Sequence, residues 1–176
     1  MYVKYLICTI VLLLVSNIWK FPVWATDYQV CLVSSYFSPT EDVEQVLDNE
    51  LSTAQSSVQA ALYGITNEIL TNRLIQLHNK GVKIEVHLDK LQSKGRYSRV
   101  NQLIEAGVPV YIKRTHALQH NKFVVVDHKK VLMGSWNWSE SANKQDNSLI
   151  KIQECIGQVG EYILEFERMK TRDGKF

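Results

Sequence analysis

The stretch from residue 120 to residue 139 constrains the fold of this chain more than any other. Residues 123–126 (FVVV) are a β-branched and aromatic run too short for a helix, which predicts a buried strand. The polar residues 127–130 are typical of a turn, and residues 131–133 return as a second strand. The sequence therefore predicts a β-hairpin.

Polar side chains accompany this predicted hairpin. His120 and Lys122 are two residues apart, so along a strand they point the same way, about 6.6 Å from each other. Asp127 completes the spacing H-x-K-x4-D, and Ser135 and Asn137 follow in a G-S-x-N. The imidazole is a nucleophile near neutral pH, the ammonium supplies positive charge, and the hydroxyl and amide are neutral donors around a tetrahedral anion.

This combination is suited to a phosphodiester. No acidic cluster accompanies it, so a divalent metal is not required to neutralise the anion, and we expect no metal and no cofactor. Gly134 is expected to let the backbone come close to a bound ligand. The alternative is an ordinary strand at whose end a His and a Lys occur by chance. The combined spacing of the motif is too long and too particular to favour this alternative.

The motif resembles the signature of the phospholipase D superfamily, a histidine–lysine–aspartate motif followed by G-S-x-N. The resemblance covers most of the chain after about residue 28. It is closest to short members with a single motif, typified by a bacterial periplasmic endonuclease. It implies an α/β sandwich, catalysis without metal and a phosphohistidine intermediate. His120 would be the nucleophile or its acid partner, and the phosphate would be held by Lys122, Ser135 and Asn137.

The resemblance also concerns three acidic residues. In such families Asp127 is mostly structural. A Glu downstream of G-S-x-N, near an Asn, usually holds the histidine ring. Here Asp146 is the nearest acid and is a methylene shorter, Glu140 is the other candidate, and a solvated loop acid is the alternative for both.

Length and charge indicate one globular domain without a strong electrostatic bias. The chain has 176 residues, of which 45% are hydrophobic and 22% charged. Lys4 and Lys20 lie in the first 25 residues, which contain no acidic residue. Residues 26–176 therefore have 18 basic and 18 acidic residues and no net charge. A net charge of zero over residues 26–176 argues weakly against tight nucleic-acid binding. Local basic patches can still exist on a domain without net charge.

The first 25 residues are predicted to be a targeting segment. A short positive start precedes an apolar run of fourteen residues, 6–19, and small or modest residues at 23 and 25 suit cleavage after Ala25. We therefore divide the chain into residues 1–25 and a catalytic domain of residues 26–176, exported to the periplasm or secreted. A retained membrane anchor over residues 5–24 stays open, and only then is membrane contact expected.

The body alternates predicted strands with predicted helices. Strands are expected at 29–33, 58–64, 82–88, 108–112 and 147–152, besides the hairpin. Helices are expected from a Ser38 cap with Glu41 closing a capping box, from an Asn67 cap with Ile69 facing inward, at 98–106 and at 156–169. This rhythm predicts a single α/β domain with a mixed, mainly parallel sheet between helices, the α-β-α fold of phospholipase D-like proteins.

Two cysteines remain in the body of the chain. Cys31 lies in a predicted apolar strand, where a lone buried cysteine is common, and export would also permit a disulfide with Cys155. Two cysteines without a C-x-x-C make zinc improbable.

The presence of a single motif predicts a homodimer with the active site at its interface. In-line attack on phosphorus needs a nucleophile on one side and a proton donor on the other, and one chain offers one motif histidine. The other four have ordinary interpretations: His78 near a helix end, His87 on a strand's solvent face, His116 in a loop and His128 in the turn. A two-fold axis would bring two copies of the motif histidine together, and the resemblance implies the same.

A basic loop indicates the substrate. Lys94, Arg96, Tyr97 and Arg99 follow a strand end and could follow a phosphate backbone and stack a base, or form a solvated loop. Trp136 could line the substrate groove or pack in the core. We expect a non-specific exported endonuclease acting on DNA or RNA. The alternatives are a phospholipase D-type hydrolase of phospholipid headgroups and a non-catalytic nucleic-acid-binding module.

Overall fold

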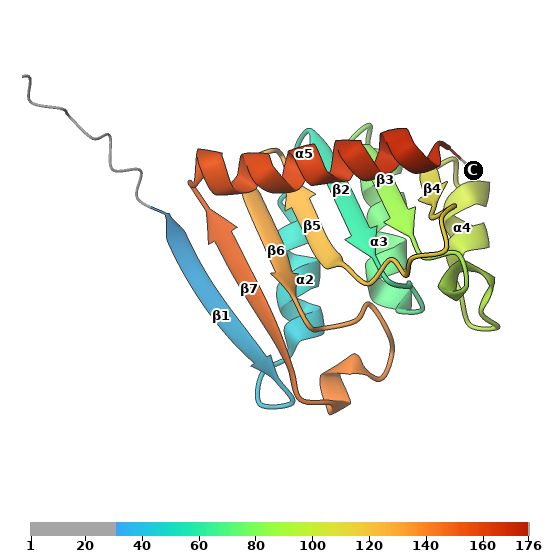
Figure 1. The fold of residues 1–176 in the computed structure, drawn as a ribbon. Coiled ribbons are helices and arrows are strands. Elements are labelled where there is room, and N and C mark those ends of the chain that lie inside the picture. The colour runs from blue at the N-terminus through green and yellow to red at the C-terminus, as the bar shows by residue number, and fades with distance from the viewer. Residues whose placement is uncertain (1–30, 176) are drawn as a thin grey trace, which may run out of the picture.

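The computed structural model describes residues 31–175, which form a layered α/β domain (Figure 1). One sheet has the strand order β1-β7-β6-β5-β2-β3-β4. Its strands are β1 (Leu32–Ser38), β2 (Ser57–Leu62), β3 (Lys83–Leu88), β4 (Val110–Ile112), β5 (Lys122–Val126), β6 (Lys130–Gly134) and β7 (Asn147–Gln153). The helices are α2 (Val43–Ser52), α3 (Glu68–Asn79), α4 (Val100–Glu105) and α5 (Ile156–Asp173), with short 3₁₀ turns η1 (Gln92–Lys94) and η2 (Ala142–Lys144).

Helices cover both faces of the sheet. α2, α3 and α4 lie on one face, and α5 runs across the other face (Figure 1). The predicted α/β sandwich with a mixed sheet is therefore confirmed.

The sheet is mixed, but it is not mainly parallel as predicted. Only β2–β3 and β3–β4 pair in parallel, and the other four neighbouring pairs are antiparallel. Parallel neighbours need a crossover, and α3 and α4 provide one at these two places. β5, β6 and β7 follow one another through connections without a crossover helix, so they pair antiparallel.

The core lies on both sides of the hairpin strand β5. Val124 and Val126 pack into the larger cluster under α2 and α3, whereas Phe123 and Val125 pack under α5 against Phe166. A strand buried on both faces is a continuous apolar run rather than an alternating one. The residue run at 123–126 has this pattern for that reason.

The helix expected to begin at Ser38 begins instead at Val43. Ser38 continues β1 opposite Asn147, and its hydroxyl donates to the Gln145 carbonyl at 2.7 Å. Asp42 caps the helix by accepting a hydrogen bond from the Gln45 amide at 3.0 Å. The ladder with β7 occupies Ser38, so the capping-box prediction was wrong by one helical turn.

Two burial predictions on the next elements were also wrong. Ile69 is 51% exposed, because Leu70 takes the inward position of α3. β3 is buried on both faces, because α3 covers one face and α5 covers the other. His87 is therefore fully buried rather than on a solvent face. Its Nε2 lies 2.9 Å from Oδ2 of Asp173 at the end of α5. By contrast, the Asn67 cap of α3 is confirmed, since its side chain accepts from the Leu70 amide at 2.9 Å.

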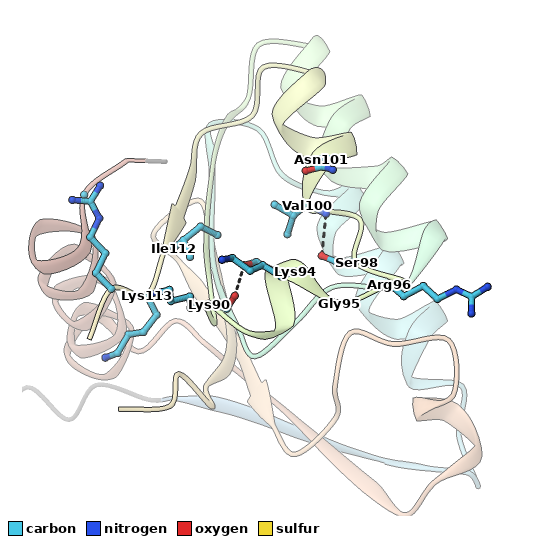
Figure 2. A pocket seen from close by; sticks show the side chains of 12 residues that line it. Lys90, Lys94, Gly95, Arg96, Ser98, Val100, Asn101, Ile112 and Lys113 are labelled. Atoms are coloured by element: carbon cyan, nitrogen blue, oxygen red, sulfur yellow. Dashed lines mark hydrogen bonds between the residues drawn. The ribbon is translucent and has the colours of Figure 1, made fainter. Parts of the chain in front are cut away.

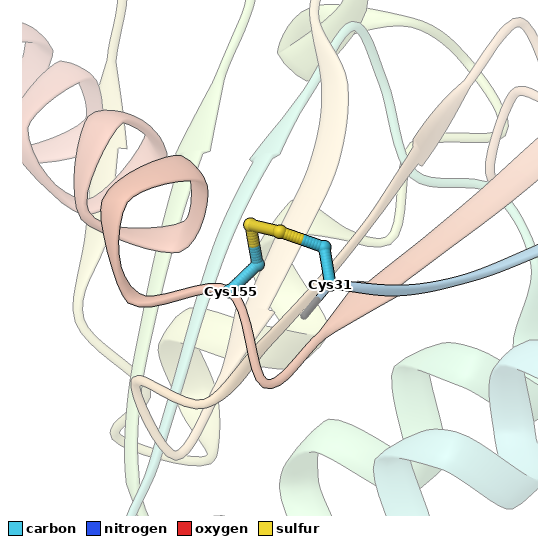
Figure 3. Close-up of a disulfide and its surroundings, with 2 residues drawn as sticks. All are labelled: Cys31 and Cys155. Atoms are coloured by element: carbon cyan, nitrogen blue, oxygen red, sulfur yellow. A yellow bond between two sulfur atoms is a disulfide. The ribbon is translucent and has the colours of Figure 1, made fainter. Parts of the chain in front are cut away.

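The two body cysteines form a disulfide. Cys31 precedes β1, and Cys155 lies at the start of α5 (Figure 3). This pairing resolves the alternatives in favour of the bridge. The predicted targeting segment, residues 1–25, lies outside the described residues. Within residues 31–175, no helix has the length and apolar character needed to cross a membrane.

Candidate active site

One edge of the sheet collects the polar residues of the motif. The parallel strands β2, β3 and β4 end at this edge. β5 begins there, because Lys122 pairs with Leu62, the last residue of β2. β6 ends and β7 begins at the same edge, where Gly134 pairs with Leu149. The fold thereby brings Ser135 and Asn147 to the edge that carries His120.

His120 and Lys122 lie together, as their spacing predicts. The Lys122 Nζ is 3.2 Å from His120 Nε2 and donates to the His120 carbonyl at 2.9 Å. An ammonium has only donors, so in this arrangement Nε2 is the acceptor and the ring proton is on Nδ1. Burial lowers the pKa of Lys122. The imidazole itself is exposed, so a phosphate can approach it.

Tyr63 completes this cluster and was missed by sequence reasoning. Its ring meets the His120 ring edge-on with centroids 4.6 Å apart, and Lys122 Nζ lies 5.4 Å from the centroid of the Tyr63 ring. The Gln92 side-chain amide donates to the Tyr63 hydroxyl at 2.9 Å. Tyr63 directly follows β2, and its place at the end of a strand in an open sheet is the signal that could have identified it.

A buried carboxylate fixes the backbone beside His120. Asp89, 3% exposed, follows β3 and accepts from the amides of Leu91 at 2.8 Å and Gln119 at 3.1 Å. The Gln119 side chain in turn accepts from the Asn121 amide at 3.0 Å. Both neighbours of His120 are therefore tied down, and Asp89 positions the imidazole without touching it.

Ser135 lies beside the start of β7. Its hydroxyl donates to Asn147 Oδ1 at 3.2 Å and accepts from the Ser148 amide at 3.0 Å. Gly134 permits this approach, because a Cβ there would collide with the Ser148 backbone. The close approach expected at Gly134 is thus to β7 and not to a ligand.

Asn137 lies in the loop after β6, between two buried tryptophans. Trp136 and Trp138 are 1% and 3% exposed and belong to the core, so of the two roles expected for Trp136 the structure has core packing and not the lining of a substrate groove. The Trp138 carbonyl accepts from the Thr66 amide at 2.9 Å, which holds this loop against the end of β2. The buried Oδ1 of Asn137 has no hydrogen-bond partner among the described residues.

Asp127 is not in the site. It follows β5 at the opposite edge, about 17 Å from Lys122 at about 3.3 Å per residue. Burial alone would raise its pKa. Backbone amides of residues 55–57 and the Ser56 hydroxyl donate to its carboxylate, and together they lower the pKa of Asp127 to about 2. Asp127 therefore holds the loop before β2, a contact of the structural kind that the resemblance implies for this residue.

Neither expected ring-holding acid contacts His120. Glu140 accepts from the Glu68 amide at 2.7 Å, at the start of α3. Asp146 is exposed and lines a shallow hollow with Ser135 and Asn147. Among residues 31–175, no carboxylate hydrogen-bonds to the His120 ring, and no three His, Cys, Asp or Glu side chains are grouped to hold a metal ion.

The basic side chains of the loop after β3 point to different places in the structure. Lys94 lines a cavity, and Figure 2 shows its ammonium directed toward Ile112. Arg96 points away from the other labelled residues of this cavity (Figure 2) and stacks over Tyr97, which is 73% exposed. Arg99 donates to Glu68 at 2.7 Å and to the Thr66 carbonyl at 2.9 Å, so it braces α3.

Comparison with known proteins identifies the family. A family model described as "Cardiolipin synthase, PLD-like domain" matches residues 47–170. This chain belongs to the phospholipase D-like family. The phospholipase D-like chain is 28% identical to "Phospholipase D" of Rickettsia bellii over 81% of its own length and 71% of that protein. It is 32% identical to "Mitochondrial cardiolipin hydrolase" of Xenopus tropicalis over 68% of its length, but spans only 57% of that protein.

Solved structures share the fold. Nuc from Salmonella typhimurium, a phospholipase D family member, superimposes with a TM-score of 0.78 over 84% of this chain and 99% of Nuc, at 19% identity. NucT from Helicobacter pylori gives a TM-score of 0.75 over 84% of this chain and all of NucT, at 21% identity. Family membership makes this protein a phospholipase D-like hydrolase of phosphodiester bonds.

Proposed function

We propose that this phospholipase D-like protein is an endonuclease that cleaves DNA or RNA through a phosphohistidine intermediate on His120. The observation that carries the proposal is the contact between His120 Nε2 and Lys122 Nζ at an exposed sheet edge. In this contact Nε2 is an acceptor, which is the state a nucleophile needs, and the His120 residue is exposed.

In the proposed reaction, His120 Nε2 attacks phosphorus and forms an N–P bond while the bond to one ester oxygen breaks. The departing oxygen takes a proton from an acid on the far side. Water then attacks phosphorus and releases His120. Lys122 and the Ser135 hydroxyl stabilise the charge on the non-bridging oxygens, and Asn137 contributes an amide from the neighbouring loop.

The acid is proposed to be His120 of a second copy of the chain. The described chain has four other histidines, and two of them are unsuitable. His87 is fully buried against Asp173, and His128 lies in the hairpin turn at the opposite edge. A two-fold axis through the exposed edge would place one imidazole on each side of the phosphate.

The dimer is tested by mixing chains. His120→Ala alone should be inactive, and heterodimers of His120→Ala with wild-type chain should be severely impaired. His116→Ala is the matched control, an exposed imidazole four residues away that should leave activity intact. Acid-quenched protein should carry phosphate on His120 during turnover. Full activity of a proven monomer, or hydrolysis surviving in His120→Ala, would contradict the mechanism.

Phospholipid hydrolysis is the second candidate. Two relatives bear the names "Phospholipase D" and "Mitochondrial cardiolipin hydrolase", and Leu91 and Leu118, 71% and 56% exposed, flank the same sheet edge. Incubation in EDTA with plasmid DNA, single strands, RNA, and phosphatidylcholine or cardiolipin vesicles separates the two. Nicking without lipid turnover supports the endonuclease, and headgroup release supports the lipase. Binding without any turnover would identify a non-catalytic module.

We further propose that the protein acts outside the cytoplasm. The Cys31–Cys155 disulfide supports export, because such bonds persist in oxidising compartments. N-terminal sequencing of the mature protein tests whether residues 1–25 are removed. An intact Met1 in the membrane fraction would favour the anchored alternative.

A further inference from the structure

A cationic cavity lies beside the candidate active site, on the same edge of the sheet. It has a volume of about 590 Å³, which is in the range of ligand pockets. Its cationic lining residues are Lys90, Lys94, Arg96, Lys113 and Arg114, and none of its lining residues is acidic. Val100 and Ile112 supply an apolar wall (Figure 2). Positive charge next to an apolar wall is the lining that a nucleotide requires, with its phosphate and its base.

Lys113 is the most informative of these residues. The residue as a whole is only 7% exposed, and its ammonium forms no hydrogen bond or ion pair with any residue between 31 and 175. Because its aliphatic part is packed, the position of its charge at the cavity is restricted. Lys94 likewise has no ion pair among the described residues, and its ammonium is directed at the wall of the cavity (Figure 2). Both lysines are therefore free to bind an anion.

The cavity is too far from His120 to hold the scissile phosphate. It is built where β3 and β4 end, and these strands are the second and third neighbours of β5 in the sheet. At about 4.8 Å per strand they lie about 10 and 14 Å from the strand that carries Lys122. The phosphate of a substrate with a single phosphodiester, bound at His120, does not reach this cavity, whereas another phosphate of a polynucleotide does.

We propose that this cavity is a subsite for a nucleotide of the substrate strand distant from the scissile bond, with its phosphate held by Lys94 and Lys113. The inference rests on the proposed nuclease function and adds a preference for polymers over small diesters. It assigns Lys113, which lies outside the loop of residues 94–99, to substrate binding. It also separates Lys94, which faces the cavity, from Arg99, which braces α3.

The test uses Lys94→Met and Lys113→Met, singly and together, because methionine keeps the aliphatic packing and removes the charge. Lys80→Met is the matched control, an exposed lysine after α3 at the opposite end of β3. Binding of a single strand of about 16 nucleotides, near the upper end of an ordinary site size, is measured by fluorescence anisotropy at several salt concentrations. Turnover is measured on the same strand and on bis(4-nitrophenyl) phosphate.

The double variant should bind the strand about tenfold more weakly. Its plot of log affinity against log salt should be shallower by about 1.4, since each lost phosphate contact removes about 0.7 for single strands. Turnover of the small diester should be unchanged, and Lys80→Met should behave as wild type. Lys113→Arg, which keeps the charge, should restore most of the binding lost in Lys113→Met.

Unchanged strand binding in the double variant would overturn the subsite. Equal loss of strand and small-diester turnover would overturn it too, because the lysines would then act at the reacting phosphate. If the strand is bound through Lys94 and Lys113 but never cut, the nuclease proposal fails and the subsite stands. Loss of binding to cardiolipin vesicles without any effect on the strand would assign the cavity to lipid instead.

Discussion

At the scale of single residues, the His120 ring is held by an aromatic edge and an ammonium rather than by a carboxylate. Tyr63 fixes the plane of the ring from one side, while the carboxylate of Asp89 fixes the backbone through Gln119. Neither residue needs to change its charge during the proposed reaction. Their contribution is orientation, which governs how often Nε2 is aligned with phosphorus.

Replacing Tyr63 tests this role. Tyr63→Leu removes the ring contact, and kcat should fall about tenfold with little change in KM, because a misaligned nucleophile reacts less often. Tyr63→Phe keeps the ring and loses only the hydroxyl contact with Gln92, so it should retain most of the activity. Steady-state kinetics on a small diester measure both. Equal losses in the two variants would assign the effect to the hydroxyl and not to the ring.

The sequence identified the local part of this site and not the part made across strands. His120, Lys122 and Ser135 could be predicted because their spacing along one hairpin fixes their side of the sheet. Tyr63 lies 57 residues before His120, and its contact depends on the register of β2 against β5. That register comes from packing on both faces of the sheet. The role of Trp136 could not be decided from the sequence for a related reason, since a large aromatic side chain beside a polar motif can face either the core or the solvent.

At the scale of elements, the hairpin β5–β6 carries different roles at its two ends. His120 and Lys122 lie at the open end, and Asp127 lies in the turn with φ of 53°. Asp127 joins the turn to residues 55–57 and so ties the hairpin to the start of β2. Helix and strand positions were largely predictable from periodicity. The start of α2 and the direction of strand pairing were not, because both depend on which strand β1 and β5 meet.

Asp127→Asn should destabilise the fold without removing the chemistry. The folded pKa of Asp127 is about 2, below its ordinary value of 3.8. Its ionised form therefore adds stability above pH 3.8, and this is lost as pH falls toward 2. After solvent screening the loss in Asp127→Asn should be about 1 kcal/mol at pH 7 and near zero at pH 2. Urea unfolding at both pH values measures it, and kcat of the folded variant should stay near wild type. A kcat loss as large as that of His120→Ala would return Asp127 to the active site.

At the scale of the whole molecule, the disulfide lies at the edge of the sheet opposite the candidate site, where β1 begins and β7 ends. The disulfide joins Cys31, before β1, to Cys155, before α5. It thus ties an outer strand of the sheet to the helix that covers one whole face. The chemistry and the covalent constraint lie at opposite ends of the strands, so stability and catalysis should respond separately to changes in this bond.

Removing the bridge tests that separation. Cys31 and Cys155 are 124 residues apart, and a loop of this length should contribute about 5 kcal/mol by restricting the unfolded chain. Cys31→Ser/Cys155→Ser should lower Tm by about 10 to 20 °C in a domain of this size, while kcat at a temperature where both proteins are folded should match wild type. Dithiothreitol should lower the Tm of wild type toward that of the double variant and leave the variant unchanged. A reductant-insensitive Tm in wild type would mean that the bond does not form in solution. A fall in kcat with Tm preserved would contradict this separation and show that the bond acts on the candidate site, which the far end of β1 reaches at Ser38.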